Sequence, residues 1–141
     1  MGSHFIKYIL AKYPDYMVVN FDKLTYAGNL ENLHEVESNP RYKFVQGDIC
    51  DRGALEKIVQ EFGTNAIINY AAETHVDRSI MDPDAFLRTD VLGTFNLLEV
   101  TKKFNLQKMV QVSTDEVYGS IERGSFTEES PFAPNSPYAA A

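Results

Sequence analysis

The sequence of 141 residues contains one cysteine, three histidines and no tryptophan. Cys50 has no partner for an internal disulfide, which is typical of proteins from a reducing cytoplasm. A lone cysteine cannot form a thiolate zinc cluster, and His4, His34 and His75 lack the spacing of metal ligands. The sequence therefore predicts a cytoplasmic protein without a metal site.

Long apolar runs and basic clusters are also missing. No apolar stretch approaches the roughly 20 residues that span a bilayer, and no signal-peptide pattern is visible. Acidic residues outnumber basic ones, 20 against 13, which gives a net charge of −7. These features argue against membrane and nucleic-acid partners.

What the sequence does contain is an alternation of short β-branched runs with longer helical stripes, in a length that suits one domain. The expected strands are 17–21, 42–46, 66–70 and 108–113, and the expected helices are 3–13, 51–63 and about 84–104. Strands separated by helices of ten or more residues pair in parallel. The sequence thus predicts an α/β fold with a doubly wound parallel sheet, covered by helices on both faces.

Polar or small residues follow each expected strand, and the carboxyl ends of parallel strands share one edge where ligands bind. These residues are Asp22, Gly47–Asp48, Ala71–Ala72–Glu73 and Ser113–Thr114–Asp115–Glu116. Asp22 either bonds a cofactor ribose or forms a turn, and Asp48 has the same two interpretations. Thr114, Asp115 and Glu116 are either a polar strand end or an acid–base group.

The front of the sequence lacks the glycine-rich turn and first strand of a dinucleotide-binding fold. Only Met1–Gly2 precede the first helix. Asp22 follows Gly2 by 20 residues, the distance expected if Gly2 is the last glycine of such a turn. The alternative is that Gly2–Ser3–His4 is the remnant of an affinity tag. The first interpretation predicts that the central strand of a 3-2-1-4-5 order is absent.

Three segments stand out, DKLTYAGN at 22–29, AAETHVDRS at 71–79 and TDEVYG at 114–119. They resemble segments of the extended short-chain dehydrogenase/reductases, and most closely of the dTDP-glucose 4,6-dehydratase family. The resemblance covers the whole chain and implies a partial NAD-binding Rossmann domain over residues 1–141. It also implies that the C-terminal sugar-binding part and the family's catalytic lysine are missing. We therefore expect that the chain alone neither folds stably nor turns over substrate.

The resemblance implies a catalytic role for four residues. Tyr138 would remove the 4-hydroxyl proton of a nucleotide sugar, and Thr114 would bond the 4-oxygen. Asp115 would act as the acid at C6 and Glu116 as the base at C5. Because C5 and C6 are bonded neighbours, two adjacent carboxyl groups suit this elimination. His75 would approach the substrate or remain a hydrogen-bonded core histidine.

The resemblance also implies the residues that hold NAD. They are Gly2, Asp22, Lys23, Thr25, Asp48, Ile49, Ala71, Ala72 and Glu73. A carboxylate at Asp22 favours NAD over NADP because it repels a 2′-phosphate. Asp90 stands where the family usually has asparagine, which leaves its polar contact open.

A stripe of Leu87, Val91, Phe95 and Leu98 on the last helix indicates either core or the interface of a homodimer. Two other function classes remain. One is a nucleotide-sugar epimerase or decarboxylase, which generally lacks the Asp115–Glu116 pair. The other is a non-catalytic nucleotide-binding fragment.

Overall fold

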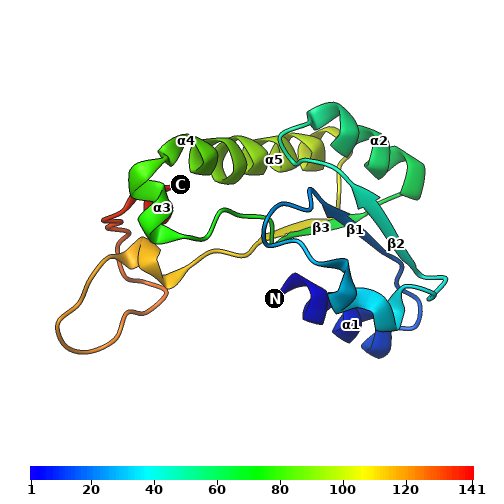
Figure 1. Cartoon of the computed structure of the whole chain (residues 1–141), viewed down its shortest axis with the longest axis horizontal. Helices are drawn as coiled ribbons and strands as arrows, with labels where there is room; N and C mark the ends of the chain where they lie inside the picture. Colours follow the sequence, from blue (N-terminus) through cyan, green and yellow to red (C-terminus); the bar gives the residue numbers. More distant parts are fainter.

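A computed structural model describes all residues from 1 to 141 and shows three layers. In Figure 1, helix α1 lies on one side of the strands, while α2 and α5 lie on the other. The larger elements are α1 Gly2–Lys12, β1 Val18–Asp22, β2 Tyr42–Gln46, α2 Arg52–Phe62, β3 Ala66–Asn69, α5 Thr94–Lys103 and β4 Lys108–Gln111. The shorter helices are η1 Leu30–Val36, α3 Val76–Met81, α4 Pro83–Phe86, η2 Leu87–Gly93, η3 Asp115–Tyr118 and α6 Pro137–Ala140.

The ends of helix α2 follow directly from the sequence. Asp51 caps the helix, because its carboxylate accepts a hydrogen bond from the backbone N–H of Ala54. Gly63 ends it with a φ of 61°, the left-handed conformation that glycine adopts without steric cost. Between them, Leu55 and Val59 are buried on one face. The prediction of this helix is confirmed.

The four strands pair in parallel, as the sequence predicts, but they form two separate sheets. Strand β1 pairs with β2, and β3 pairs with β4. No strand of the described chain lies between β1 and β3, the place of the central strand in a 3-2-1-4-5 order. The prediction of an α/β fold with parallel pairing is confirmed, while a continuous four-stranded sheet is absent.

Each pair of strands packs against its own helices. Ile6 and Leu10 of α1 form one core cluster with Leu33 and Tyr42 beside β1 and β2. The second cluster joins α2 to α5. Its members are Ile49, Leu55, Val59, Leu97 and Val100. Because Phe21 of β1 and Ile67 of β3 both pack against it, the second cluster ties the two sheets together.

The long helix expected at about 84–104 is divided into three helical segments. Pro83 begins α4, which is favourable because the first turn of a helix needs no N–H donor there. Residues 87–93 then form the π-helical segment η2, and α5 continues from Thr94. Single π-turns inside helices are rare and often occur at functional sites.

None of the helices is long and apolar enough to cross a membrane.

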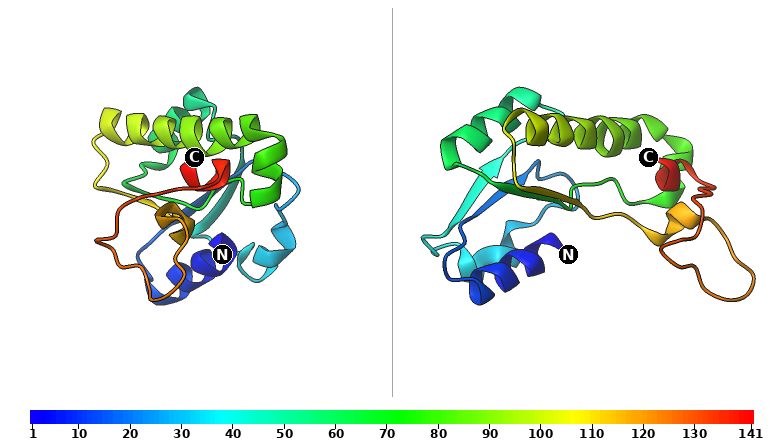
Figure 2. Two further views of the ribbon diagram at one scale, coloured as in Figure 1. Left: turned by 90° about the vertical axis from the view of Figure 1, so that its left-hand side faces the viewer. Right: turned by 180° about the vertical axis from the view of Figure 1, so that it is seen from behind.

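Residues 119–135 form an excursion that projects from one end of the molecule (Figure 2). Its neck is closed by a hydrogen bond of 2.9 Å from the Ala133 N–H to the Val117 carbonyl oxygen. Gly119 at the neck has a φ of 84°, and a Cβ there would overlap the carbonyl oxygen of Ala133. Only glycine therefore fits this position without strain.

Candidate functional site

The loops after β1 and β2 are joined by an ion pair. Lys23 Nζ lies 2.7 Å from Asp48 Oδ2, and Asp48 Oδ1 accepts a hydrogen bond from the Cys50 N–H. Burial alone would raise the pKa of Asp48, but these two partners outweigh it and lower the pKa. The same ion pair raises the pKa of Lys23. Two predicted cofactor residues thus meet directly at the strand ends.

Asp22 ends β1 with an exposed carboxylate. Its Oδ1 accepts a 2.7 Å hydrogen bond from the backbone N–H of Leu24, which has a φ of 56°. The turn and the ribose interpretation of Asp22 are therefore compatible, because one carboxylate oxygen shapes the loop and the other remains open. Thr25 is exposed, and its carbonyl oxygen accepts a hydrogen bond from the Gly28 N–H.

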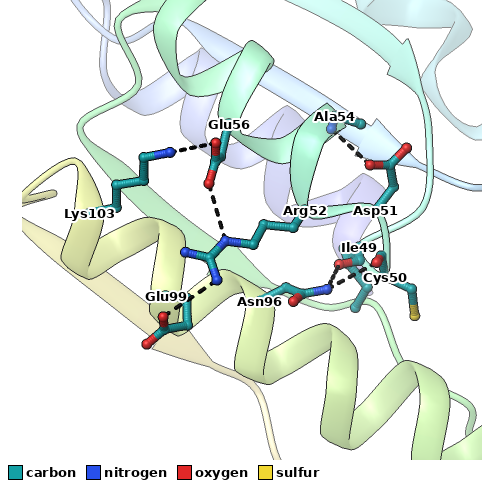
Figure 3. A network of polar contacts seen from close by, with 9 residues as sticks. All are labelled: Ile49, Cys50, Asp51, Arg52, Ala54, Glu56, Asn96, Glu99 and Lys103. Carbon is teal, nitrogen blue, oxygen red and sulfur yellow. Dashed lines mark hydrogen bonds and ion pairs between the residues drawn. The ribbon is translucent and has the colours of Figure 1, made fainter.

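Ile49 lies differently from the other predicted cofactor residues. Its side chain is 7% exposed and belongs to the core between α2 and α5. Asn96 of α5 donates hydrogen bonds of 3.1 and 3.0 Å to the carbonyl oxygens of Ile49 and Cys50 (Figure 3). Any contact of Ile49 with a cofactor therefore falls to its backbone, which Asn96 fixes in place.

A network of ion pairs joins helices α2 and α5, which flank the loop that contains Ile49 and Cys50. Arg52 of α2 contacts both Glu56 of its own helix and Glu99 of α5, at 3.1 and 3.5 Å. Lys103 of α5 reaches back to Glu56 at 2.6 Å. Figure 3 shows these side chains bridging the two helices beside Asn96.

The loop after β3 presents small exposed residues to the same edge. Ala71 and Ala72 are exposed. A Cβ placed on Gly2, in the first turn of α1, would lie 3.6 Å from the Cβ of Tyr70. The start of α1 therefore reaches the carboxyl end of β3, where its free N–H groups favour an anionic group.

Glu73 connects this loop to the loop after β1. The Tyr26 hydroxyl donates a 3.4 Å hydrogen bond to Glu73 Oε2. The guanidinium of Arg78 lies 4.9 Å from the centre of the Tyr26 ring, and the His75 ring lies at 5.6 Å. Neither Tyr26 nor Arg78 was predicted as a site residue, although both lie inside the segments that carry the family resemblance.

Thr114, Asp115 and Glu116 form the start of the short helix η3. The Thr114 hydroxyl caps this helix by accepting a 3.3 Å hydrogen bond from the Glu116 N–H. The Asp115 side chain is exposed and lines an open pocket with Tyr118 and Phe126. The cap thus fixes the backbone at the start of η3, which carries the two neighbouring carboxyl groups.

Tyr138 is carried to the same region by helix α6, which contacts η3, α3 and α4. Its backbone N–H donates a 3.1 Å hydrogen bond to the Ser79 hydroxyl, which itself donates to the Val76 carbonyl oxygen. The Tyr138 ring meets Phe86 edge-on, with centroids 6.4 Å apart. Ser79 is fully buried and was missed as a site residue; its only signal is its place at the end of AAETHVDRS.

The predicted residues therefore gather in two adjoining groups. The loops after β1, β2 and β3 form one group, and η3 with α6 forms the other. His75, at the start of α3, is exposed; its ring lies 5.6 Å from that of Tyr26 in the first group, and α3 contacts α6 of the second. No group of three or more His, Cys, Asp or Glu side chains has a geometry that holds a metal ion. An exposed strand-end carboxylate, a helix start and small loop residues together fit an elongated nucleotide cofactor.

Comparison with known proteins agrees with this arrangement. The family model described as GDP-mannose 4,6 dehydratase matches residues 1–141. The dTDP-glucose 4,6-dehydratase of Streptomyces griseus is 46% identical over the whole chain, which spans 43% of that protein. The enzyme of the same name from Neisseria meningitidis is 45% identical, with 42% of its length covered.

Solved structures give the same result. The dTDP-glucose 4,6-dehydratase of Streptomyces venezuelae, determined with NAD bound, is 51% identical and superposes with a TM-score of 0.92. The match covers 99% of this chain and 44% of that one. A UDP-glucose 4-epimerase from Thermus thermophilus, also in complex with NAD, is 32% identical with a TM-score of 0.84, and 43% of that chain is covered. The chain thus spans less than half of these relatives, and it belongs to the GDP-mannose 4,6 dehydratase family of Rossmann-type short-chain dehydrogenase/reductases.

Proposed function

We propose that this chain is the cofactor-binding part of an NAD-dependent dehydratase that converts dTDP-glucose into dTDP-4-keto-6-deoxyglucose. The observation that carries the proposal is the Asp115–Glu116 pair on η3, capped by Thr114 and packed beside the helix of Tyr138. Relatives of this name are 45–46% identical over the whole chain. The choice of thymine as the nucleotide base rests on those relatives and not on a residue of the site.

The cofactor assignment rests on the loops after β1, β2 and β3. Bound NAD would accept a hydride from C4 of the sugar and return one to C6. Asp22 would bond the adenosine ribose through its free carboxylate oxygen, and Lys23 with Asp48 would border the adenine. Gly2 and Ala71–Glu73 would lie along the rest of the cofactor. Relatives were solved with NAD bound.

The chain's own residues supply the proton transfers. Tyr138 takes the proton from the 4-hydroxyl, and Thr114 bonds the same oxygen as charge develops. Glu116 then takes the proton from C5, which the 4-ketone acidifies. Asp115 gives a proton to the departing C6 hydroxyl.

The test is Glu116→Gln in the protein expressed from the complete reading frame. The variant is expected to keep C4 oxidation, seen as reduced nicotinamide absorbance after mixing with dTDP-glucose, while elimination falls by about 10² or more. Glu129→Gln in the exposed excursion is the matched control and should turn over normally. Unchanged product formation by Glu116→Gln would refute its role as the base. Release of a 4-epimer instead of the 4-keto-6-deoxy sugar would favour the epimerase alternative.

We further propose that the protein is a homodimer through the stripe of Leu87, Val91, Phe95 and Leu98. These four side chains are 46–55% exposed along η2 and α5, so they are not core. An apolar helix face of this kind favours a partner. Phe95→Glu should convert dimer to monomer in light scattering, whereas Lys102→Glu on the same helix should not. A wild-type monomer would refute the assembly.

A cytoplasmic location also belongs to this proposal. It is supported by Cys50, which is the only cysteine and carries a free thiol. Fractionation of cells that express the complete protein tests it, and recovery outside the cytoplasm would refute it.

A further inference from the structure

The π-helical segment η2 places one acid beneath the loop that follows β3. Asp90 lies in the middle of η2 and is half-buried. Its Oδ1 accepts a 2.9 Å hydrogen bond from the backbone N–H of Glu73. A π-turn shifts the side chains of a helix relative to the regular repeat. In this segment the Asp90 carboxylate lies within hydrogen-bond distance of the Glu73 N–H.

Side chains fix the backbone of this loop from three directions. The Ala71 N–H donates a 3.1 Å hydrogen bond to Asn69 Oδ1, and Asp90 accepts from the Glu73 N–H. The Glu73 carboxylate is in turn held by the hydroxyl of Tyr26 at 3.4 Å, from the loop after β1. The N–H groups of Ala71 and Glu73 are therefore both bonded to side chains of the protein, on either side of the exposed Ala72.

The charge around Asp90 is one-sided. Burial raises the pKa of Asp90 to about 6; the hydrogen bond from the Glu73 N–H opposes this shift, and the Glu73 carboxylate adds to it. Glu73 is the only charged group found to act on Asp90. The guanidinium of Arg78 lies over the ring of Tyr26, whose hydroxyl donates to Glu73.

We propose that Asp90 is a positioning residue for the cofactor: its carboxylate holds the Glu73 N–H and so fixes the Ala71–Glu73 backbone against which the cofactor lies. The identity of that cofactor as NAD rests on the proposed function, while the positioning itself rests on the hydrogen bonds of the loop. Asp90 does not touch the reacting atoms and acts only through the backbone of Glu73.

The proton on Asp90 controls the strength of this hold. An ionised acceptor forms a stronger hydrogen bond to an N–H than a neutral one does. The Glu73 N–H is therefore held more weakly once Asp90 is protonated. NAD affinity should fall as the pH drops through about 6, by about 3- to 10-fold.

The experiment measures the NAD dissociation constant by calorimetry across this pH range, in the protein from the complete reading frame. Asp90→Asn keeps an acceptor oxygen but cannot titrate, so its affinity should be flat through pH 6 at the level of the protonated wild type. Asp84→Asn, an exposed acid on the neighbouring α4, is the control and should keep the wild-type profile. All other groups are the same in both proteins, so the difference between the wild-type and Asp90→Asn profiles reports Asp90 alone.

A second measurement does not depend on NAD. Hydrogen exchange at the Glu73 amide should accelerate about 10-fold in Asp90→Leu, which removes the acceptor, and less in Asp90→Asn. A pH profile of Asp90→Asn that matches the wild type would overturn the proposal, as would unchanged exchange at Glu73. A wild-type protein that binds NAD but has no dehydratase activity would instead count against the proposed function alone.

Discussion

The two halves of the divided sheet hold their functional loops in different ways. Around β1 and β2, neighbouring strand-end residues fix one another, as Lys23 does with Asp48 and Asp22 with Leu24. Around β3 and β4, the corresponding contacts come instead from side chains of the helices η2 and α3. Asp90 of η2 holds Glu73, and Ser79 of α3 holds Tyr138.

This difference has an electrostatic side as well. Asp48 in the first half is paired with a cation, so its pKa lies below the usual value, although burial opposes this. Asp90 in the second half is half-buried without a cation, so its pKa lies above the usual value. Ionisation of Asp48 therefore stabilises the folded protein, whereas ionisation of Asp90 lowers its stability. The following variants, made in the complete reading frame, test this contrast.

The largest effect is expected from Phe86→Ala. Phe86 is 2% exposed and packs against the ring of Tyr138, so the variant leaves a cavity under α6. We expect a loss of about 3–5 kcal/mol in the free energy of unfolding, measured by denaturant titration. Hydrogen exchange should rise in α3, α4 and α6 but not in β1 and β2. A uniform rise through both halves would contradict the separation.

Ser79→Ala should have the next largest effect. The buried hydroxyl is replaced by a methyl group, which leaves the Tyr138 N–H without its acceptor. We expect the free energy of unfolding to fall by about 1–2 kcal/mol. Turnover should fall further than substrate affinity, because Tyr138 loses its position. Ser120→Ala, an exposed serine in the excursion, is the control, and equal losses in both variants would show that Ser79 has no special role.

Asp90→Asn should stabilise the protein above pH 6. The folded pKa of about 6 exceeds the ordinary value of 3.8, so the ionised form costs stability at higher pH. This cost appears as the pH rises from about 4 to 6 and is constant above. After allowance for the solvent that reaches a half-buried group, we expect a gain of about 1 kcal/mol at neutral pH. Melting temperatures across this range measure it, and a variant less stable than wild type at neutral pH would reverse the sign.

Asp48→Asn should show the opposite dependence and the smallest effect. Its folded pKa lies below 3.8, so its contribution is present above that pH and is lost on acidification. Because Lys23 is 58% exposed, we expect a loss of only about 0.5 kcal/mol at neutral pH, diminished by salt. Melting curves at low and high salt provide the measurement. A salt-independent loss would point to the Cys50 hydrogen bond rather than to the ion pair.

The sequence predicted most of what depends on local chemistry. Strand β2 has the expected bounds, Asp51 caps α2, and Gly63 ends it, because apolar periodicity and cap residues act over a few positions. The strand-end loops also converge, since parallel pairing brings carboxyl ends to one edge. The roles of the individual site residues stay predictions, because they concern contacts with a cofactor and a substrate rather than contacts within the chain.

Features that depend on distant contacts could not be predicted in the same way. The π-turn at Asp90 breaks a regular apolar stripe that indicates an uninterrupted helix. The hydroxyl of Ser79 matters only because α6 returns to it 59 positions later. The predicted contact of Ile49 with the cofactor gave no sign that its side chain fills the core beside Gly93, where a Cβ would overlap it.

The closed neck at Gly119 has a consequence for engineering. Because the Ala133–Val117 hydrogen bond closes the neck of the excursion, we expect the segment between these residues to tolerate changes in length with little effect on η3 and α6. One wall of the pocket beside Asp115 is built from this segment, including Phe126. Exchanging this segment between related proteins is therefore expected to change one wall of the pocket while Asp115 and Glu116 keep their positions.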